Sequence, residues 1–195
     1  ATGVILSICY LIIQYIIAGL VAKKNPFKCI WNIIPAYLTG FSICSSSAVI
    51  PVTLECAMKN GATKEIANFT VPLCSTVHMC GSTIKLITTS IAVMYLSGMN
   101  ISFALFAISA VAAPGVMGGV LMASIGLLES VLGFSPEQSA LMMTIYLALD
   151  GYGPACNVSG DGAITLIIDR FFGKDMHPHN NKMSIFKIGL RSHIM

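Results

Sequence analysis

The chain has 195 residues, of which 55% are hydrophobic and 10% are charged, and its formal net charge is +3. A soluble domain carries about 25% charged residues, so this composition excludes an ordinary soluble globular protein and indicates a membrane protein. The net charge is too small to favour nucleic acid as a partner.

The predicted elements follow one another along the chain as long apolar segments separated by short polar loops. They are a helix over 3–22, a re-entrant hairpin over 29–57, a helix over 66–96, a second re-entrant hairpin over 101–130, a helix over 138–169 and a basic tail over 174–195. We therefore expect an all-α membrane protein in which a core domain, 1–173, precedes a cytoplasmic tail.

The first hairpin is inferred from the placement of positive charge. Lys23, Lys24 and Lys28 precede the apolar segment 29–57, and Lys59 and Lys64 follow it. Short loops rich in lysine stay cytoplasmic, so both loops are expected on one side of the membrane. The segment must then enter and return. A plain bundle of spanning helices is the alternative, and it would place Lys59 and Lys64 outside.

Two polar or broken stretches mark the predicted hairpin tips. Ser45–Ser47 and Pro51 interrupt the first apolar segment, and the sequence VAAPGVMGG over 111–119 interrupts the segment 101–130. Non-helical backbone inside a membrane is tolerated only where it faces protein or a wet cavity. Two tips entering from opposite faces predict an inverted repeat with a binding site near the midplane.

Ionisable and amide side chains inside the apolar segments are candidates for function, because burying them in a membrane is costly. They are His78, Lys85, Asp150, Asn157 and Asp161. The spacing of Asp150, Asn157 and Asp161 predicts one stripe along a single helix. No cation is near them in sequence, so we expect the two carboxylates to be protonated or cation-bound. The alternatives are that Asp161 only caps a helix end and that Asp150 lies at the outer interface.

The sequence CSTVHMCGS, residues 74–82, predicts an unwound point within the helix 66–96. Free backbone carbonyls there would be cation ligands. Cys74, His78 and Cys80, with Cys44 as a fourth ligand, are a further hypothesis for a soft-metal site. His78 is equally interpreted as a packed neutral imidazole, and Lys85 as a side chain that snorkels or pairs with an acid.

Four motifs in this order resemble the dicarboxylate/amino acid:cation symporter family, to which the glutamate and aspartate carriers belong. The motifs are SSSAVIPVTLE (45–55), VPLCSTVHMCGSTI (71–84), AAPGVMGG (112–119) and NVSGDG (157–162). The resemblance covers nearly the whole chain to about Phe172 and corresponds to the last part of the family's transport domain. The chain begins at Ala1 with no initiator methionine, so we expect it to be the C-terminal part of a longer protein.

The resemblance implies a set of substrate-binding residues. They are Ser45, Ser46, Ser47, Ser82, Ala112, Pro114, Gly115, Asp150 and Asn157. In the family's arrangement the serine tip binds the substrate carboxylate, and Asp150, helped by Asn157, accepts a hydrogen bond from the substrate amino group. Ala112–Gly115 would be the outer gate.

The resemblance also implies a coupling-cation site for Na⁺, with H⁺ as the alternative and with no other cofactor. Its residues are Cys74, Thr76, His78, Asn157 and Asp161. His78 stands where the family has asparagine and Cys80 where it has aspartate, so both changes remove ligands of a further sodium site. His78 could instead carry a proton.

The resemblance predicts a secondary transporter in the plasma membrane, not an enzyme. Gly153 stands where members for acidic substrates have an arginine, and Pro154 replaces a threonine. We therefore predict symport of a small neutral amino acid. The alternatives are an acidic amino acid or C4-dicarboxylate symporter, a non-transporting truncated fragment and a membrane metal-binding protein. Membrane lipid is an expected partner, and a homotrimer is expected from the family alone.

Overall fold

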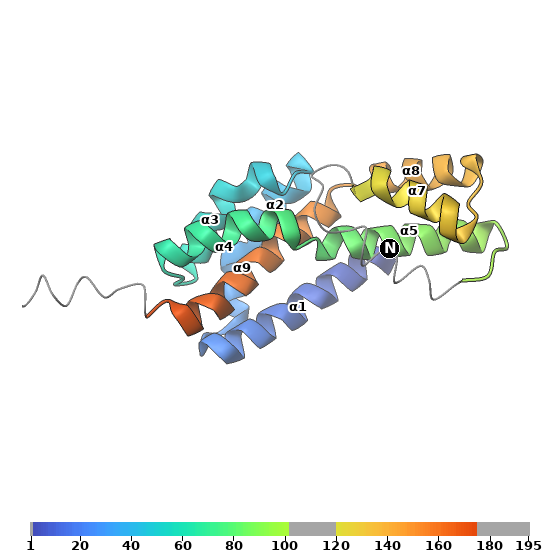
Figure 1. Cartoon of the computed structure of the whole chain (residues 1–195). Helices are drawn as coiled ribbons and strands as arrows, with labels where there is room; N and C mark the ends of the chain where they lie inside the picture. The colour runs from blue at the N-terminus through green and yellow to red at the C-terminus, as the bar shows by residue number, and fades with distance from the viewer. Residues whose placement is uncertain (1, 102–119, 175–195) are drawn as a thin grey trace, which may run out of the picture.

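The computed structural model describes residues 2–101 and 120–174, and within them the chain is all helix, turn and loop (Figure 1). The helices are α1 (Thr2–Ala22), α2 (Pro26–Ile43), the 3₁₀ turn η1 (Ser47–Val49), α3 (Ile50–Lys59), α4 (Lys64–Val77), α5 (Cys80–Leu96), α7 (Val120–Leu132), α8 (Pro136–Ala148) and α9 (Tyr152–Phe172). Two stretches of these residues, Thr2–Ala22 and Lys64–Leu96, are long and apolar enough to cross a membrane. The all-α prediction is confirmed for the described residues.

Helix α9 is the centre of the molecule. It contacts α1, α2, α3, α4 and α5, and its residues from Tyr152 to Ala163 are all buried. Small side chains let the neighbouring backbones come close, as they do in membrane helix bundles. A Cβ at Gly40 of α2 would lie 3.1 Å from the Cα of Ala155. The polar side chains in this buried stretch, such as Asn157 and Asp161, therefore depend on partners inside the protein.

Two apolar clusters flank this central helix. One joins α1, α2, α3 and α4 to α9, with Tyr15, Ile33, Val71 and Leu166 among its buried members. The other joins α5, α7 and α8 through buried side chains that include Leu86, Leu128 and Met142. Helices α7 and α8 accordingly lie side by side along α5, beyond the N-terminal end of α9 (Figure 1).

The chain reverses direction between α2 and α3. Asn25 caps α2 by accepting hydrogen bonds from the backbone N–H groups of Phe27 and Lys28, and α2 ends at Cys44, which has a φ of 57°. Asn60, after α3, returns to the start of α2, where its Nδ2 donates to the carbonyl of Cys29 over 3.0 Å. The two helices are thus antiparallel arms of one hairpin. That the hairpin enters the membrane and returns on the same side stays a prediction.

The predicted single helices over 66–96 and 138–169 are each divided. The first is interrupted at His78 and Met79, between α4 and α5, as the polar run over 74–82 indicated. The second is interrupted between Ala148 and Tyr152. The prediction of one continuous helix over 138–169 is therefore wrong. Of the second predicted hairpin, only its end from Val120 lies in the described residues, and the tip over 112–119 and the tail from 175 lie outside them.

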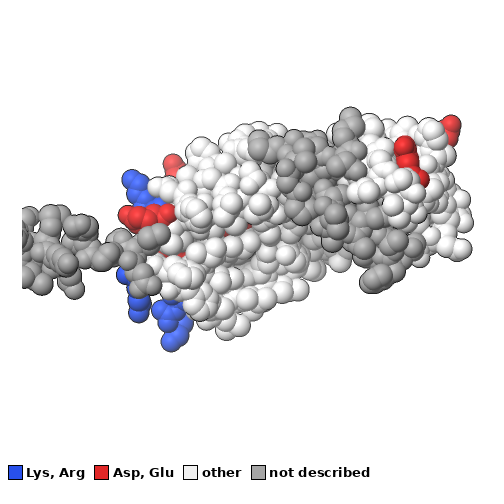
Figure 2. Space-filling model, in the orientation of Figure 1, with Lys and Arg blue, Asp and Glu red and all other residues white. Residues whose placement is uncertain are grey.

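Charged side chains separate along the molecule. On the face in Figure 2 the visible Lys and Arg side chains gather at one end, and only acidic side chains are visible at the other. At the basic end Lys24 donates to the carbonyls of Asn60 and Gly61, each over 2.8 Å. The loop after α1 and the loop after α3 therefore lie together. Their proximity agrees with a common side for both loops, and the cytoplasmic placement that the lysine distribution indicates stays a prediction.

Replacing Gly81 by alanine tests the close approach of α5 to α9. A Cβ at Gly81 would overlap the carbonyl oxygen of Gly153 and lie 2.5 Å from the Cβ of Cys156. Overpacking of this kind costs about 1–3 kcal/mol, so we expect Gly81→Ala to lower the unfolding temperature in detergent. Gly126→Ala is the matched control, because a Cβ at Gly126 meets nothing within 4 Å. Equal stability of the two variants would contradict the packing.

Cysteine accessibility tests the membrane side of the two loops. Lys28 and Lys59 are exposed, and single cysteines there should react with an impermeant maleimide from the same, cytoplasmic side of sealed vesicles. A cysteine at the exposed Glu137 should react from the other side. The background needs Cys9→Ser and Cys44→Ser, because these native thiols are exposed. Labelling of positions 28 and 59 from opposite sides would exclude a re-entrant hairpin.

Candidate substrate and cation site

The break between α4 and α5 turns His78 toward α9. The His78 Nδ1 lies 2.9 Å from Asp161 Oδ1, and the Asp161 side chain is 1% exposed. Gly160 makes room for the imidazole, because a Cβ there would overlap the His78 ring. The sequence predicted an Asp161 without a basic partner. The structure corrects this, since the partner comes from a helix 83 positions away in the chain.

A second layer fixes the imidazole from α1. Gln14 Nε2 lies 3.4 Å from His78 Nε2 and donates to the hydroxyl of Tyr10 over 3.2 Å. An amide N–H that donates to Nε2 leaves the ring proton on Nδ1, where it faces the carboxylate. The helix α1 thereby holds the ring in the orientation that its bond to Asp161 needs.

One oxygen of Asp161 remains without a hydrogen-bond partner among the described residues. This atom, Oδ2, is buried. A buried carboxylate oxygen is a strong ligand for a hard cation, and the backbone carbonyls at the end of α4, including that of Thr76, lie outside its regular helical bonds. The Asp161 carboxylate is therefore suited to be a Na⁺ ligand. The carbonyl of Cys74 already accepts a hydrogen bond from the backbone N–H of His78 over 2.7 Å.

Asn157 joins α9 to the first turn of α5. Its Oδ1 accepts from the N–H groups of Gly81 and Ser82, over 2.7 and 3.4 Å, and its Nδ2 donates to Ser82 Oγ over 3.0 Å. One side chain thus satisfies the free N–H groups at a helix start inside the protein. Asn157 and Ser82 were both predicted to contact the substrate, and here their side chains are hydrogen-bonded to each other.

Asp150 does not share a helical stripe with Asn157 and Asp161. It lies in the turn between α8 and α9, and its carboxylate forms an ion pair with Lys85 of α5. The Lys85 ammonium also lies 3.6 Å from the centroid of the Tyr146 ring. The prediction that both carboxylates lack a basic partner is therefore wrong for Asp150 as well.

The serine tip approaches this turn. A Cβ at Gly151 would lie 2.6 Å from the carbonyl oxygen of Phe41, near the end of α2. The tip follows directly, with Ser45 Oγ accepting from the N–H of Ala48 over 3.5 Å and Ser46 nearly buried at 9% exposure. The end of α2, which leads into the first hairpin tip, therefore lies beside the turn that holds Asp150. Ala112, Pro114 and Gly115 lie outside the described residues.

The hypothesis of a soft-metal site is not supported by the arrangement of the described residues. No three His, Cys, Asp or Glu side chains in 2–101 and 120–174 form a group that could hold a metal ion. His78 faces Asp161 instead, and Cys80 Sγ lies 3.9 Å from Cys156 Sγ. Both thiols therefore pack between α5 and α9.

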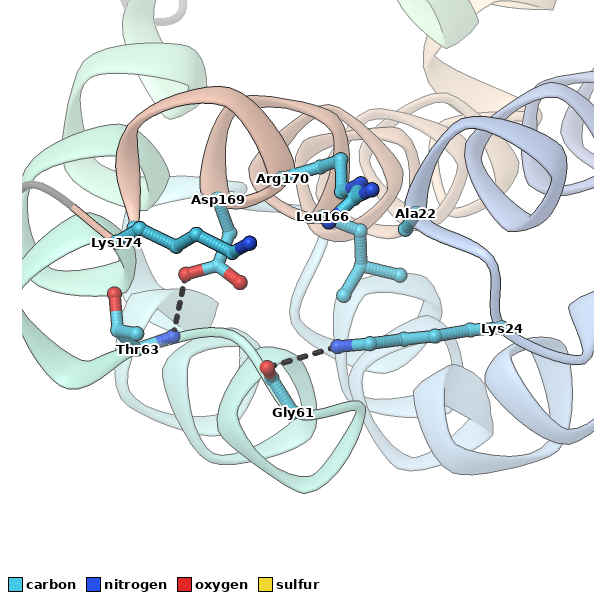
Figure 3. Close-up of a pocket in the computed structure, with 9 residues that line it drawn as sticks. Ala22, Lys24, Gly61, Thr63, Leu166, Asp169, Arg170 and Lys174 are labelled. Atoms are coloured by element: carbon cyan, nitrogen blue, oxygen red, sulfur yellow. Dashed lines mark hydrogen bonds between the residues drawn. The ribbon is translucent and has the colours of Figure 1, made fainter.

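A cavity of about 300 Å³ lies at the basic end, away from both ion pairs (Figure 3). Lys24, Asp169, Arg170 and Lys174 line it. Asp169 Oδ1 accepts from the N–H of Thr63 over 2.8 Å, so this acid fastens the loop before α4. The polar groups here hold loops together, and they do not coincide with the predicted substrate residues.

Sequence reasoning missed the contributions of Gln14, Tyr10 and Tyr146. Gln14 carried a usable signal, since it is an amide in the middle of an apolar spanning helix. Tyr146 gave none, because an aromatic residue in an apolar run is typical of packing. The pairing of Lys85 was left open and is now assigned.

Comparisons with known proteins identify the family of the chain. The profile of the sodium:dicarboxylate symporter family matches residues 1–171. The chain belongs to this family. It is 30% identical over 178 residues to excitatory amino acid transporter 3 of Mus musculus, covering 88% of this chain and 34% of that protein.

Other relatives carry different substrate names. The neutral amino acid transporter B(0) of Rattus norvegicus is 30% identical over 82% of this chain and 31% of its own length. The serine/threonine transporter SstT of Acinetobacter baylyi is 30% identical over 82% of this chain and 43% of its own length. The chain thus spans about a third of the length of the first of these relatives and less than half of the last. Members of this family are transporters, and the family name specifies sodium.

A double-mutant cycle tests the His78–Asp161 pair. Removing one partner of a buried pair leaves the other uncompensated, at a cost of about 3–5 kcal/mol. We expect His78→Ala to lower the free energy of unfolding strongly in the parent and only weakly in an Asp161→Asn background. Denaturant unfolding in detergent measures the coupling. Additive effects of the two substitutions would show that the contact contributes no coupling energy.

Proposed function

We propose that this chain is the substrate- and cation-binding part of a symporter, which couples the influx of a cation to that of a small carboxylate-bearing solute by alternating access. The observation that carries the proposal is the cluster of polar groups at the broken helix α4–α5 and at α9, in a chain of this family. Buried ionisable groups at a helix break are typical of transporter sites.

The cation part of the proposal rests on Asp161. Its Oδ2 is buried and without a hydrogen-bond partner among the described residues, so a Na⁺ would meet a carboxylate ligand there together with carbonyls at the end of α4. When bound, the ion supplies positive charge to this carboxylate. His78 holds Oδ1 at 2.9 Å and so keeps Oδ2 in a fixed position. H⁺ is the alternative coupling ion, because an imidazole stands where the family has asparagine.

The substrate part rests on the first hairpin tip. Ser46, with the backbone at Ser45 and Ser47, would bind a carboxylate through N–H and O–H donors. The proposal is supported by the approach of Phe41, near the end of α2, to Gly151, which follows Asp150 in the α8–α9 turn. In this proposal the segment around Ala112, Pro114 and Gly115 closes over the bound solute, and the closed state needs both cation and substrate.

A neutral amino acid is one member of the proposed substrate class. Gly153 supplies no side chain for a second carboxylate, and two of the relatives are named for neutral amino acids or for serine and threonine. Lys85 supplies a positive charge from α5, so acidic amino acids and dicarboxylates belong to the class too. The membrane is proposed to be the plasma membrane, and a homotrimer is proposed from the family alone.

Uptake by the full-length natural protein in liposomes tests the proposal. Labelled alanine, serine, aspartate and succinate are offered under a sodium gradient and a pH gradient, each imposed separately. We expect one of the gradients to drive accumulation of at least one of these solutes, and dissipation of that gradient to abolish it. The absence of uptake of every one of them under both gradients would overturn the proposal.

Asp161→Asn tests whether the Asp161 carboxylate binds the coupling cation. Loss of a charged ligand is expected to weaken the apparent affinity for the driving cation by about tenfold or more, which is about 1.4 kcal/mol. Glu129→Gln is a matched control, because Glu129 is an exposed acid on α7. Unchanged cation affinity in Asp161→Asn would show that the cation binds elsewhere.

A further inference from the structure

Lys85 is the one fully buried cation among the described lysines and arginines, with 0% of its surface exposed. A buried ammonium must be paired, because the charge is otherwise lost or the fold destabilised. Its partners are the carboxylate of Asp150 and the face of Tyr146. The proposed function uses Lys85 only as a positive charge, and it does not say what the ion pair with Asp150 does to the choice of substrate.

The pair is asymmetric in its exposure. The Lys85 side chain is 1% exposed, whereas the Asp150 side chain is 34% exposed. The ammonium therefore lies inside and the carboxylate faces the accessible side. Two residues beside Lys85, Leu86 of α5 and Tyr146 of α8, are buried in the cluster of α5, α7 and α8.

Gly153 of α9 lies beside this lysine. A Cβ at Gly153 would be in ordinary van der Waals contact with Lys85, 3.5 Å from Cε and 3.6 Å from Nζ. A side chain longer than that of alanine at 153 would compete with the ammonium for this space. The positive charge beside Asp150 is thus supplied by α5, next to a position of α9 that carries no side chain.

We propose that the Lys85 ammonium group pairs with Asp150 in the place that a substrate amino group would take. The site therefore prefers small carboxylates without an α-ammonium group over the corresponding amino acids. This inference rests on the proposed transport function. A tethered group competes at an effective concentration in the millimolar range or above, so a free ammonium group is disfavoured. The paired Asp150 also repels an incoming carboxylate less than a lone aspartate would.

Binding by the full-length natural protein tests the preference with two matched pairs of probes. Succinate and aspartate differ only in the α-amino group, and so do propionate and alanine. We expect the probe without the amino group to bind about tenfold more tightly in each pair, measured by thermal stabilisation and radioligand binding, because displacing Lys85 would leave a buried charge uncompensated.

Substitutions at Lys85 separate specificity from stability. Lys85→Gln frees the Asp150 carboxylate, so the affinity ratio should move by about tenfold or more toward the amino acid. Lys85→Arg keeps the positive charge and should keep the preference of the parent. Lys28→Gln, at an exposed lysine of α2, is the matched control and should leave the ratio unchanged.

Two results would overturn the inference while the proposed function stands. One is a parent protein that binds or carries the amino acid of each pair at least as well as its partner, which is informative even if Lys85→Gln does not fold. The other is a folded Lys85→Gln variant with the parent's ratio. Failure of the parent to bind or carry any of these four probes or serine under either cation gradient would instead overturn the proposed function, and this inference with it.

Discussion

The structure depends on the burial of a polar helix. Helix α9 carries an amide and a carboxylate yet is enclosed by α1–α5, where no water is at hand to satisfy them. Each of these groups meets the segment around the α4–α5 break: Asn157 holds the first turn of α5, and His78 holds Asp161. A break in an apolar helix leaves backbone groups without hydrogen bonds, which costs free energy unless other groups supply them. Here Asn157 supplies acceptors for backbone N–H groups at the start of α5, and Asp161 supplies a partner for the His78 side chain.

The same constraint explains where the two ion pairs lie. His78–Asp161 sits inside the cluster that surrounds α9, whereas Lys85–Asp150 sits where that cluster meets the one formed by α5, α7 and α8. Both pairs join the broken segment to the last part of the chain. They differ in access, because one carboxylate is 1% exposed and the other 34%. The buried Asp161 is thus suited to bind a desolvated cation, and the partly exposed Asp150 is suited to contact a solute that binds and dissociates.

The sequence alone was enough for the helical class, for the reversal near Ser45–Ser47 and for the break near His78, because each has a local signal in apolar runs, lysine-rich loops or clustered polar residues. The pairing of Lys85 with Asp150 had none, since it depends on how α5 packs against the α8–α9 turn, and the two residues are 65 positions apart. The position of Asp150 in a turn, not on the helix, did have a signal in the sequence. Pro154 is accepted in the first turn of a helix, which indicated a helix start just after Asp150.

The central place of α9 has a consequence for biosynthesis. Tyr15 of α1 donates to the carbonyl of Ser159, 144 positions later in the chain, and Gln14 belongs to the network that ends at Asp161. The ribosome therefore delivers α1, α4 and α5 to the bilayer well before the helix that completes them. Until then their polar groups need temporary partners, such as water, lipid headgroups or the insertion machinery. Assembly of this unit accordingly waits for α9, and a delay in the synthesis of α9 would lengthen the time for which these polar groups lack their final partners.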